Sequence, residues 1–158
     1  MNMIRMIDAV LIFIFSFVYS AKTDSIIQQS NKQSQGIEGV VFWRSGNQMP
    51  SPDESATGMK GKPIVREIVV FKLTKTNETK QCKTFFSAIK TAEVGRTRSD
   101  SAGYFLLKLP PGNYSIFVRE EKGLFANRFD GHNNICPVEV KAGEIAKIEL
   151  IVDYAASY

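Results

Sequence analysis

Apolar residues at every second position dominate the chain from about residue 36 to residue 152. The first run shows the pattern clearly, with Ile37, Val41 and Trp43 in one phase. Successive side chains of a strand point to opposite faces of a sheet, whereas a helix brings residues three and four apart onto one face. A repeat of two therefore predicts strands throughout this region.

These alternating runs are short, and turn residues separate them. The expected strands cover residues 37–43, 65–73, 94–99, 104–109, 114–120, 138–140 and 148–152. Turns are expected at 100–103 and 110–113, where Asp, Pro and Gly favour tight reversals of the backbone. Residues 85–94 fit either a short helical turn or an irregular strand. About seven short strands with frequent turns predict an all-β fold, an antiparallel β-sandwich.

The first 20 residues have the features of a signal peptide. Arg5 precedes the apolar run 9–18, which is shorter than the roughly 20 apolar residues that a membrane-spanning helix needs. Val18 and Ser20 suit the positions that signal peptidase inspects, so cleavage is expected after Ser20 and no transmembrane span is expected in the mature chain. An uncleaved N-terminal anchor is the alternative.

Two further regions follow the signal peptide. Residues 21–35 are polar and rich in Gln and Ser, and they are expected to form a flexible leader. Residues 36–158 are expected to form the sandwich, which is long enough to bury a core of its own. The expected location is secreted or periplasmic.

Composition excludes several kinds of chemistry. The net charge of +4 is spread along the chain without a run of like charges, so no nucleic-acid partner is predicted. One histidine, His132, and two cysteines cannot supply the common zinc sites. A serine nucleophile would depend on His132, which lies in a polar loop, and no Gly-x-Ser-x-Gly motif is present. We therefore expect a protein that is not an enzyme and that carries no cofactor and no metal.

One segment resembles a known family. Residues 97–118, TRSDSAGYFLLKLPPGNYSIFV, resemble the signature of the carboxypeptidase regulatory-like domain, a transthyretin-like β-sandwich. The matching positions are Ser99-Asp100, Gly103, Phe105, Leu109-Pro110-Pro111-Gly112 and Tyr114. The resemblance covers residues 36–152, with 46–60 as an insertion, and it extends to small, secreted, standalone bacterial proteins of this domain. It implies the sandwich without carboxypeptidase activity, because the zinc ligands are missing.

The polar loops 46–60 and 123–135 are the expected recognition site, because loops on a rigid sandwich usually carry binding. The candidate contact aromatics are Trp43, Phe42, Phe117, Phe125 and Phe129. Phe117 is the strongest of them, since it is out of phase with its apolar neighbours. Exposed aromatics would suit a carbohydrate-binding, starch-binding-like module, whereas packing in the core is the competing interpretation.

Oxygen ligands gather in the loop 123–135. Asp130, Asn133 and Asn134 are candidate binding residues, and Asp130 could begin a calcium site. The same residues are also typical of a tight turn, in which Asp and Asn bond the backbone. The sequence leaves both roles open.

Cys82 and Cys136 are an even pair in an exported chain, so a disulfide is permitted. Two free thiols are the alternative, and the sequence does not choose between them. Together these features predict a non-catalytic, secreted or periplasmic module whose partner is an envelope protein or a glycan.

Overall fold

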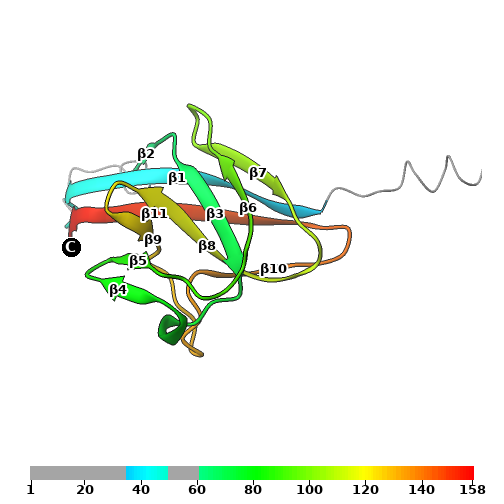
Figure 1. Cartoon of the computed structure of the whole chain (residues 1–158). Coiled ribbons are helices and arrows are strands. Elements are labelled where there is room, and N and C mark those ends of the chain that lie inside the picture. The colour runs from blue at the N-terminus through cyan, green and yellow to red at the C-terminus, as the bar shows by residue number, and fades with distance from the viewer. Residues whose placement is uncertain (1–34, 50–60) are drawn as a thin grey trace, which may run out of the picture. The chain divides into compact units, whose positions relative to one another are not determined.

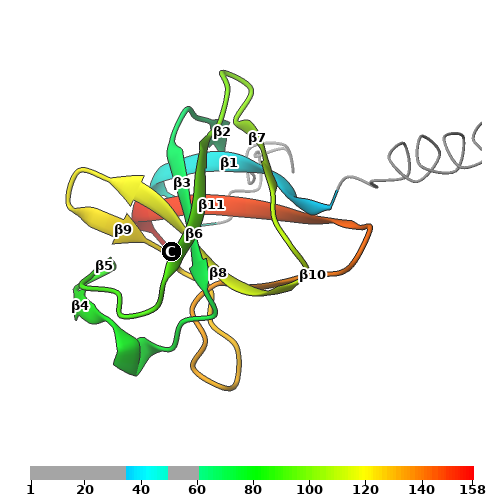
Figure 2. The same cartoon turned by 45° about the vertical axis from the view of Figure 1, so that its right-hand side comes forward.

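Two sheets form the part of the chain that the computed structural model describes, residues 35–49 and 61–158. The four-stranded sheet contains β1 (Gly36–Asn47), β2 (Lys62–Pro63), β7 (Tyr104–Lys108) and β11 (Ile145–Ser157). The seven-stranded sheet contains β3 (Glu67–Lys72), β4 (Lys80–Cys82), β5 (Phe85–Ser87), β6 (Glu93–Arg98), β8 (Gly112–Glu120), β9 (Gly123–Phe125) and β10 (Pro137–Val140). Figures 1 and 2 show β3, β6 and β8 crossing over β1 and β11, so the sheets form two layers.

This architecture confirms the predicted all-β sandwich, with more strands than the sequence indicated. The additional strands β2, β4, β5 and β9 are two or three residues long, too short to show an alternating pattern. Residues 85–94 form β5 and the start of β6, joined by a bend in which Ala88 has a φ of 48°. The strand alternative for this stretch is therefore correct. One short 3-10 helix, η2 (Thr76–Glu78), precedes β4.

Several predictions fall on residues outside the described ranges. They are the signal peptide 1–20, positions 21–34 of the leader and positions 50–60 of the loop 46–60. Among the residues that the structure describes, no helix has the length and apolar character needed to cross a membrane.

β1 is the central strand of the four-stranded sheet. It pairs antiparallel with β2 and β7, and parallel with β11 from Gly36↔Ile145 to Asn47↔Ser157. All the pairs of the other sheet are antiparallel within the described residues. The antiparallel prediction therefore holds except between β1 and β11. These two strands stand at the two ends of the sandwich sequence, and parallel pairing requires a long connection rather than a hairpin.

The core lies between the two sheets. β1 contributes Ile37 and Val41, and these side chains belong to one buried cluster with those of β3 and β8. Tyr114 is 1% exposed, and its hydroxyl donates to the Pro110 carbonyl at 2.7 Å. The sequence predicts this combination of a core aromatic and a satisfied hydroxyl, and the structure confirms it.

Candidate functional site

Asp130 fixes the loop between β9 and β10. Its Oδ1 accepts hydrogen bonds from the backbone N–H groups of His132 at 2.8 Å and Asn134 at 2.9 Å, and its Oδ2 accepts from Asn134 Nδ2 at 2.7 Å. The Asn134 side chain, followed by the backbone N–H of Asn134, lowers the pKa of Asp130. Asn133 has a φ of 62° and is exposed. These contacts are those of the turn alternative, and a calcium ion would have to displace them.

The two loops predicted as one recognition site are attached to different segments. Ile135 N–H donates to the Thr74 carbonyl at 2.9 Å, and Thr76 N–H donates to the Asn133 carbonyl at 3.1 Å. Figure 1 shows this loop beside η2. The described start of the loop 46–60 is attached to the end of β11, since Gln48 N–H donates to the Ser157 carbonyl at 2.8 Å.

Phe117 is wrongly predicted as an exposed contact residue, since it is 0% exposed. Its ring lies 5.6 Å from that of Phe71 and 5.7 Å from that of Phe86. Phe129 contacts Phe86 at 6.3 Å and belongs to the same group of rings. Phe117 is out of phase with Tyr114, Ile116 and Val118 because it points to the other face of β8, where it packs against Phe71 and Phe86.

Phe125 is also wrongly predicted as a contact residue, because it is 2% exposed. Its ring lies 5.5 Å from Tyr154, which also contacts Trp43 at 5.1 Å and Phe85 at 5.0 Å. Trp43 is half-buried against the core. Phe42 is half-buried, so Phe129 is the only one of the five candidate aromatics that is largely exposed, at 50%.

The cysteines do not form a disulfide. Cys82 is exposed at the end of β4, whereas Cys136 is buried and its N–H donates to the Arg128 carbonyl at 2.7 Å. The free-thiol alternative is therefore correct, and the disulfide alternative is wrong. Burial raises the pKa of the Cys136 thiol, so its reactive thiolate form is disfavoured.

A groove of about 630 Å³ lies where β3 begins and β8 ends. Its walls carry three arginines and three glutamates beside a tyrosine and a valine. They are Val65, Arg66, Glu67, Arg98, Arg119, Glu120, Glu121 and Tyr154. None of these residues was predicted as a site residue. The charges of the walls balance, so the groove can select a ligand by directed hydrogen bonds rather than by net charge.

Glu120 links two other side chains that line this groove, those of Arg66 and Tyr154. Its side chain is 5% exposed and accepts from Arg66 Nε at 2.7 Å and from the Tyr154 hydroxyl at 3.0 Å. These donors offset the cost of removing a carboxylate from water. Burial raises the pKa of Tyr154, and the hydrogen bond to Glu120 raises it further, so the hydroxyl stays protonated as a donor.

Glu67 is the second glutamate of the groove that contacts arginine side chains. It lies opposite Arg98 on β6, and its Oε2 accepts from Arg119 Nε on β8 at 2.5 Å. Arg96 Nη1 approaches Glu67 at 3.6 Å. In the described part of the chain, the Arg98 side chain forms no ion pair, and the Arg119 side chain donates a hydrogen bond through Nε and none through its two terminal nitrogens. Both guanidinium groups therefore keep donors for a ligand.

Two Arg-Glu dipeptides produce this arrangement. Arg66-Glu67 and Arg119-Glu120 lie on neighbouring antiparallel strands, so each arginine faces the glutamate of the other pair. Both dipeptides lie in strands that the sequence predicts, 65–73 and 114–120, so the sequence offered a signal for this pairing of charges. It becomes informative only once the register of those strands is known, because a shift of one residue would move each side chain to the other face.

Comparison of the chain with protein-family models, with curated proteins and with solved structures finds no match. In the described ranges, no group of three or more His, Cys, Asp and Glu side chains could hold a metal ion. Function is therefore inferred from the geometry of the groove.

Proposed function

We propose that the chain is a non-catalytic, exported binding module, built on a sandwich of the carboxypeptidase regulatory-like kind. Its groove binds an acidic segment of another protein of the cell envelope. The observation that carries this proposal is the pair Arg98 and Arg119, whose uncommitted guanidinium donors line one groove. Guanidinium groups match carboxylates by paired, directional hydrogen bonds.

The glutamates of the groove support this function. Glu67 and Glu120 hold Arg119 and Arg66 through their Nε atoms, which fixes the position of each guanidinium before a ligand arrives. A side chain that is already ordered loses less conformational entropy on binding. Export is proposed from the signal peptide that the sequence predicts over residues 1–20, and an exported module would meet partners in the cell envelope.

A glycan is the second candidate, and Phe129 is the observation that favours it. Its ring is 50% exposed and could serve as a stacking surface. Phe117 and Phe125, two of the other candidate rings, are buried and cannot belong to such a surface. For this reason we prefer a protein partner.

The proposal is tested by binding a fluorescent oligoglutamate peptide to the wild-type chain and to Arg98→Ala and Arg119→Ala. A hydrogen bond to a charged group contributes about 1.5–3 kcal/mol, so each substitution is expected to weaken binding about tenfold or more. Arg98→Lys is expected to restore little, because an ammonium cannot make the paired contact.

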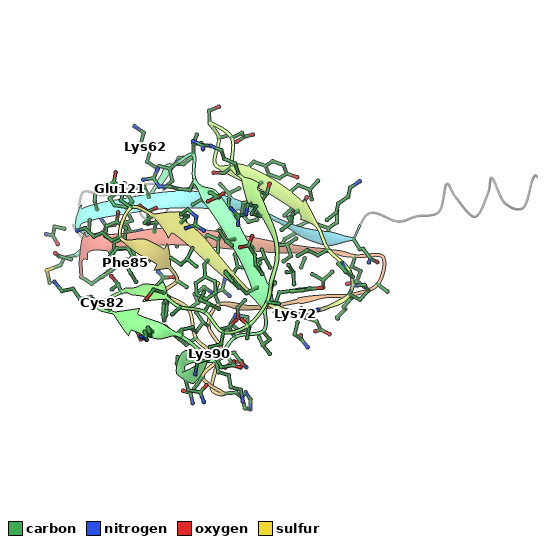
Figure 3. All side chains as sticks on the ribbon, viewed as in Figure 1. Lys62, Lys72, Cys82, Phe85, Lys90 and Glu121 are labelled. Carbon is green, nitrogen blue, oxygen red and sulfur yellow. The ribbon has the colours of Figure 1, made fainter. Side chains whose placement is uncertain are left out.

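Lys90→Ala is the matched control, since it removes an exposed cation far from the groove. Figure 3 shows Lys90 well separated from Glu121, which lines the groove. Polygalacturonate in place of the peptide tests an acidic glycan. Equal peptide affinity in the wild type and both arginine variants would refute the proposal, and tighter binding of the glycan with dependence on Phe129 would favour the second candidate.

A further inference from the structure

Glu121 differs from the other two glutamates of the groove. Glu67 accepts from Arg119, and Glu120 accepts from Arg66, so both of these carboxylates already have a partner. Glu121 is exposed and lies in the turn between β8 and β9, as Figure 3 shows. Its side chain makes no hydrogen bond or ion pair to any residue that the structure describes. One carboxylate of the groove is therefore uncommitted.

The Glu121 carboxylate acts on the same groove as the two arginines with free donors. Glu121 lines that groove together with Arg98 and Arg119. Burial and the hydrogen bond to Glu120 raise the pKa of Tyr154, and the negative charge of Glu121 raises it further. The charge of Glu121 therefore reaches a hydroxyl in the wall of the groove. A ligand that enters meets two guanidinium groups with free donors and one free carboxylate.

The spacing of these charges fits an extended ligand. Arg119 is the last residue but one of β8, and Glu121 follows it by two positions. Strand residues advance about 3.3 Å each, so the two backbone positions are at most about 7 Å apart. Two residues of an extended peptide that are separated by one residue have a similar spacing and point to the same face. An acidic and a basic residue at this separation can therefore reach Arg119 and Glu121 together.

We propose that the acidic segment bound in the groove also carries a basic residue, two positions from its acidic residue and on the same side of the segment. This inference rests on the proposed function, since it describes the ligand of the same groove. The carboxylate bonds Arg98 and Arg119, and the ammonium or guanidinium group pairs with Glu121. A purely acidic segment places a carboxylate beside Glu121, and such a contact between like charges weakens binding. The groove thereby discriminates against partners that are only acidic.

Two fluorescent peptides of identical composition test the spacing. The spaced peptide repeats Glu-Ser-Lys-Ser twice, so that each Glu stands two positions from a Lys. The adjacent peptide repeats Glu-Lys-Ser-Ser twice, and none of its charges stand two positions apart. The wild-type chain is expected to bind the spaced peptide about tenfold more tightly than the adjacent peptide or an oligoglutamate of equal length. Equal affinity for the two matched peptides overturns the proposal.

Charge reversal at Glu121 tests the residue itself. Glu121→Lys is expected to weaken binding of the spaced peptide about tenfold and to strengthen binding of oligoglutamate. Glu121→Gln should remove the preference for the spaced peptide. Glu139→Lys is the matched control, because it makes the same change in net charge opposite Asn113 at the start of β8, whereas the groove lies at the end of that strand. Glu121→Lys and Glu139→Lys binding the spaced peptide equally well would overturn the proposal.

These measurements separate this inference from the proposed function. The proposed function depends on the two arginines, and Arg98→Ala and Arg119→Ala test it with oligoglutamate. Binding that depends on both arginines but not on Glu121 leaves the acidic ligand standing and overturns the mixed-charge ligand. Oligoglutamate binding that is independent of both arginines refutes the proposed function and this inference with it.

Discussion

At the scale of single residues, one carboxylate fixes a whole loop. Asp130 accepts hydrogen bonds from two backbone N–H groups and one side-chain amide, and these bonds lower its pKa. The sequence left this turn and a calcium site open as alternatives for the same three residues. The contacts are those of the turn, because the oxygens of Asp130 are occupied by donors from its own loop.

Asp130→Asn is expected to remove part of the acid sensitivity of the fold. The lowered pKa means that ionised Asp130 stabilises the folded chain above about pH 4, and that this contribution is lost as the pH falls through the folded pKa. The free energy of unfolding, measured with denaturant from about pH 5 to about pH 2, should therefore fall less steeply with decreasing pH in the variant than in the wild type. Glu139→Gln is the control, since the exposed side chain of Glu139 has no hydrogen bond or ion pair to another described residue. Equal slopes in all three chains would contradict the prediction.

At the scale of elements, β1 is confined on both sides. Gly39 lies opposite Ile148 of β11 and Phe105 of β7. A Cβ atom at this position would lie 2.2 Å from the Ile148 carbonyl oxygen and 3.0 Å from the Phe105 ring. Because Gly39 has no side chain, the neighbouring strands can approach β1 closely at this point. The sequence pattern showed only that Gly39 lies on the same face of its strand as Ile37 and Val41.

Gly39→Ala is therefore expected to lower the free energy of unfolding by about 1–3 kcal/mol or more, since the backbone must shift to admit the methyl group. Urea unfolding followed by circular dichroism measures this change. Gly131→Ala is the matched control, because nothing lies within 4 Å of the added Cβ there. If both variants lose the same free energy of unfolding, the close contact at Gly39 does not destabilise the Gly39→Ala variant, and the prediction is wrong.

At the scale of the whole molecule, packing between distant segments decides exposure. β8 has the sequence of a strand with one apolar face, yet it is buried on both faces. One face meets the other sheet, and on the other face Phe117 packs against Phe71 and Phe86. The two cysteines show the same effect, since Cys136 is buried and Cys82 is exposed.

Thiol titration is expected to separate the two cysteines. In the folded chain, Cys82 should react quickly with a disulfide reagent, whereas Cys136 should react only after unfolding, because it is buried and its pKa is raised. The Cys82→Ser variant should show no fast reaction, and reductant should not change the unfolding midpoint of the wild type. A folded chain without any reactive thiol would instead indicate a disulfide.

The sequence by itself determined the local structure of this protein. Alternation predicted the principal strands, and the segments 100–103 (Asp-Ser-Ala-Gly) and 110–113 (Pro-Pro-Gly-Asn) predicted the turns. Tyr114 was predicted as a core residue with a bonded hydroxyl. These features depend on residues close together in the chain, where side-chain period and backbone preference suffice.

Only the tertiary structure decided which residues meet. The parallel pairing of β1 with β11, the burial of Phe117, the separation of the thiols and the groove all depend on strand register and on what covers each face. Arg66 and Glu120 are 54 positions apart, and their contact follows from the pairing of β3 with β8. Alternation of apolar residues in the sequence indicates a strand with two different faces, but the neighbouring strands and loops determine which of those faces reaches solvent.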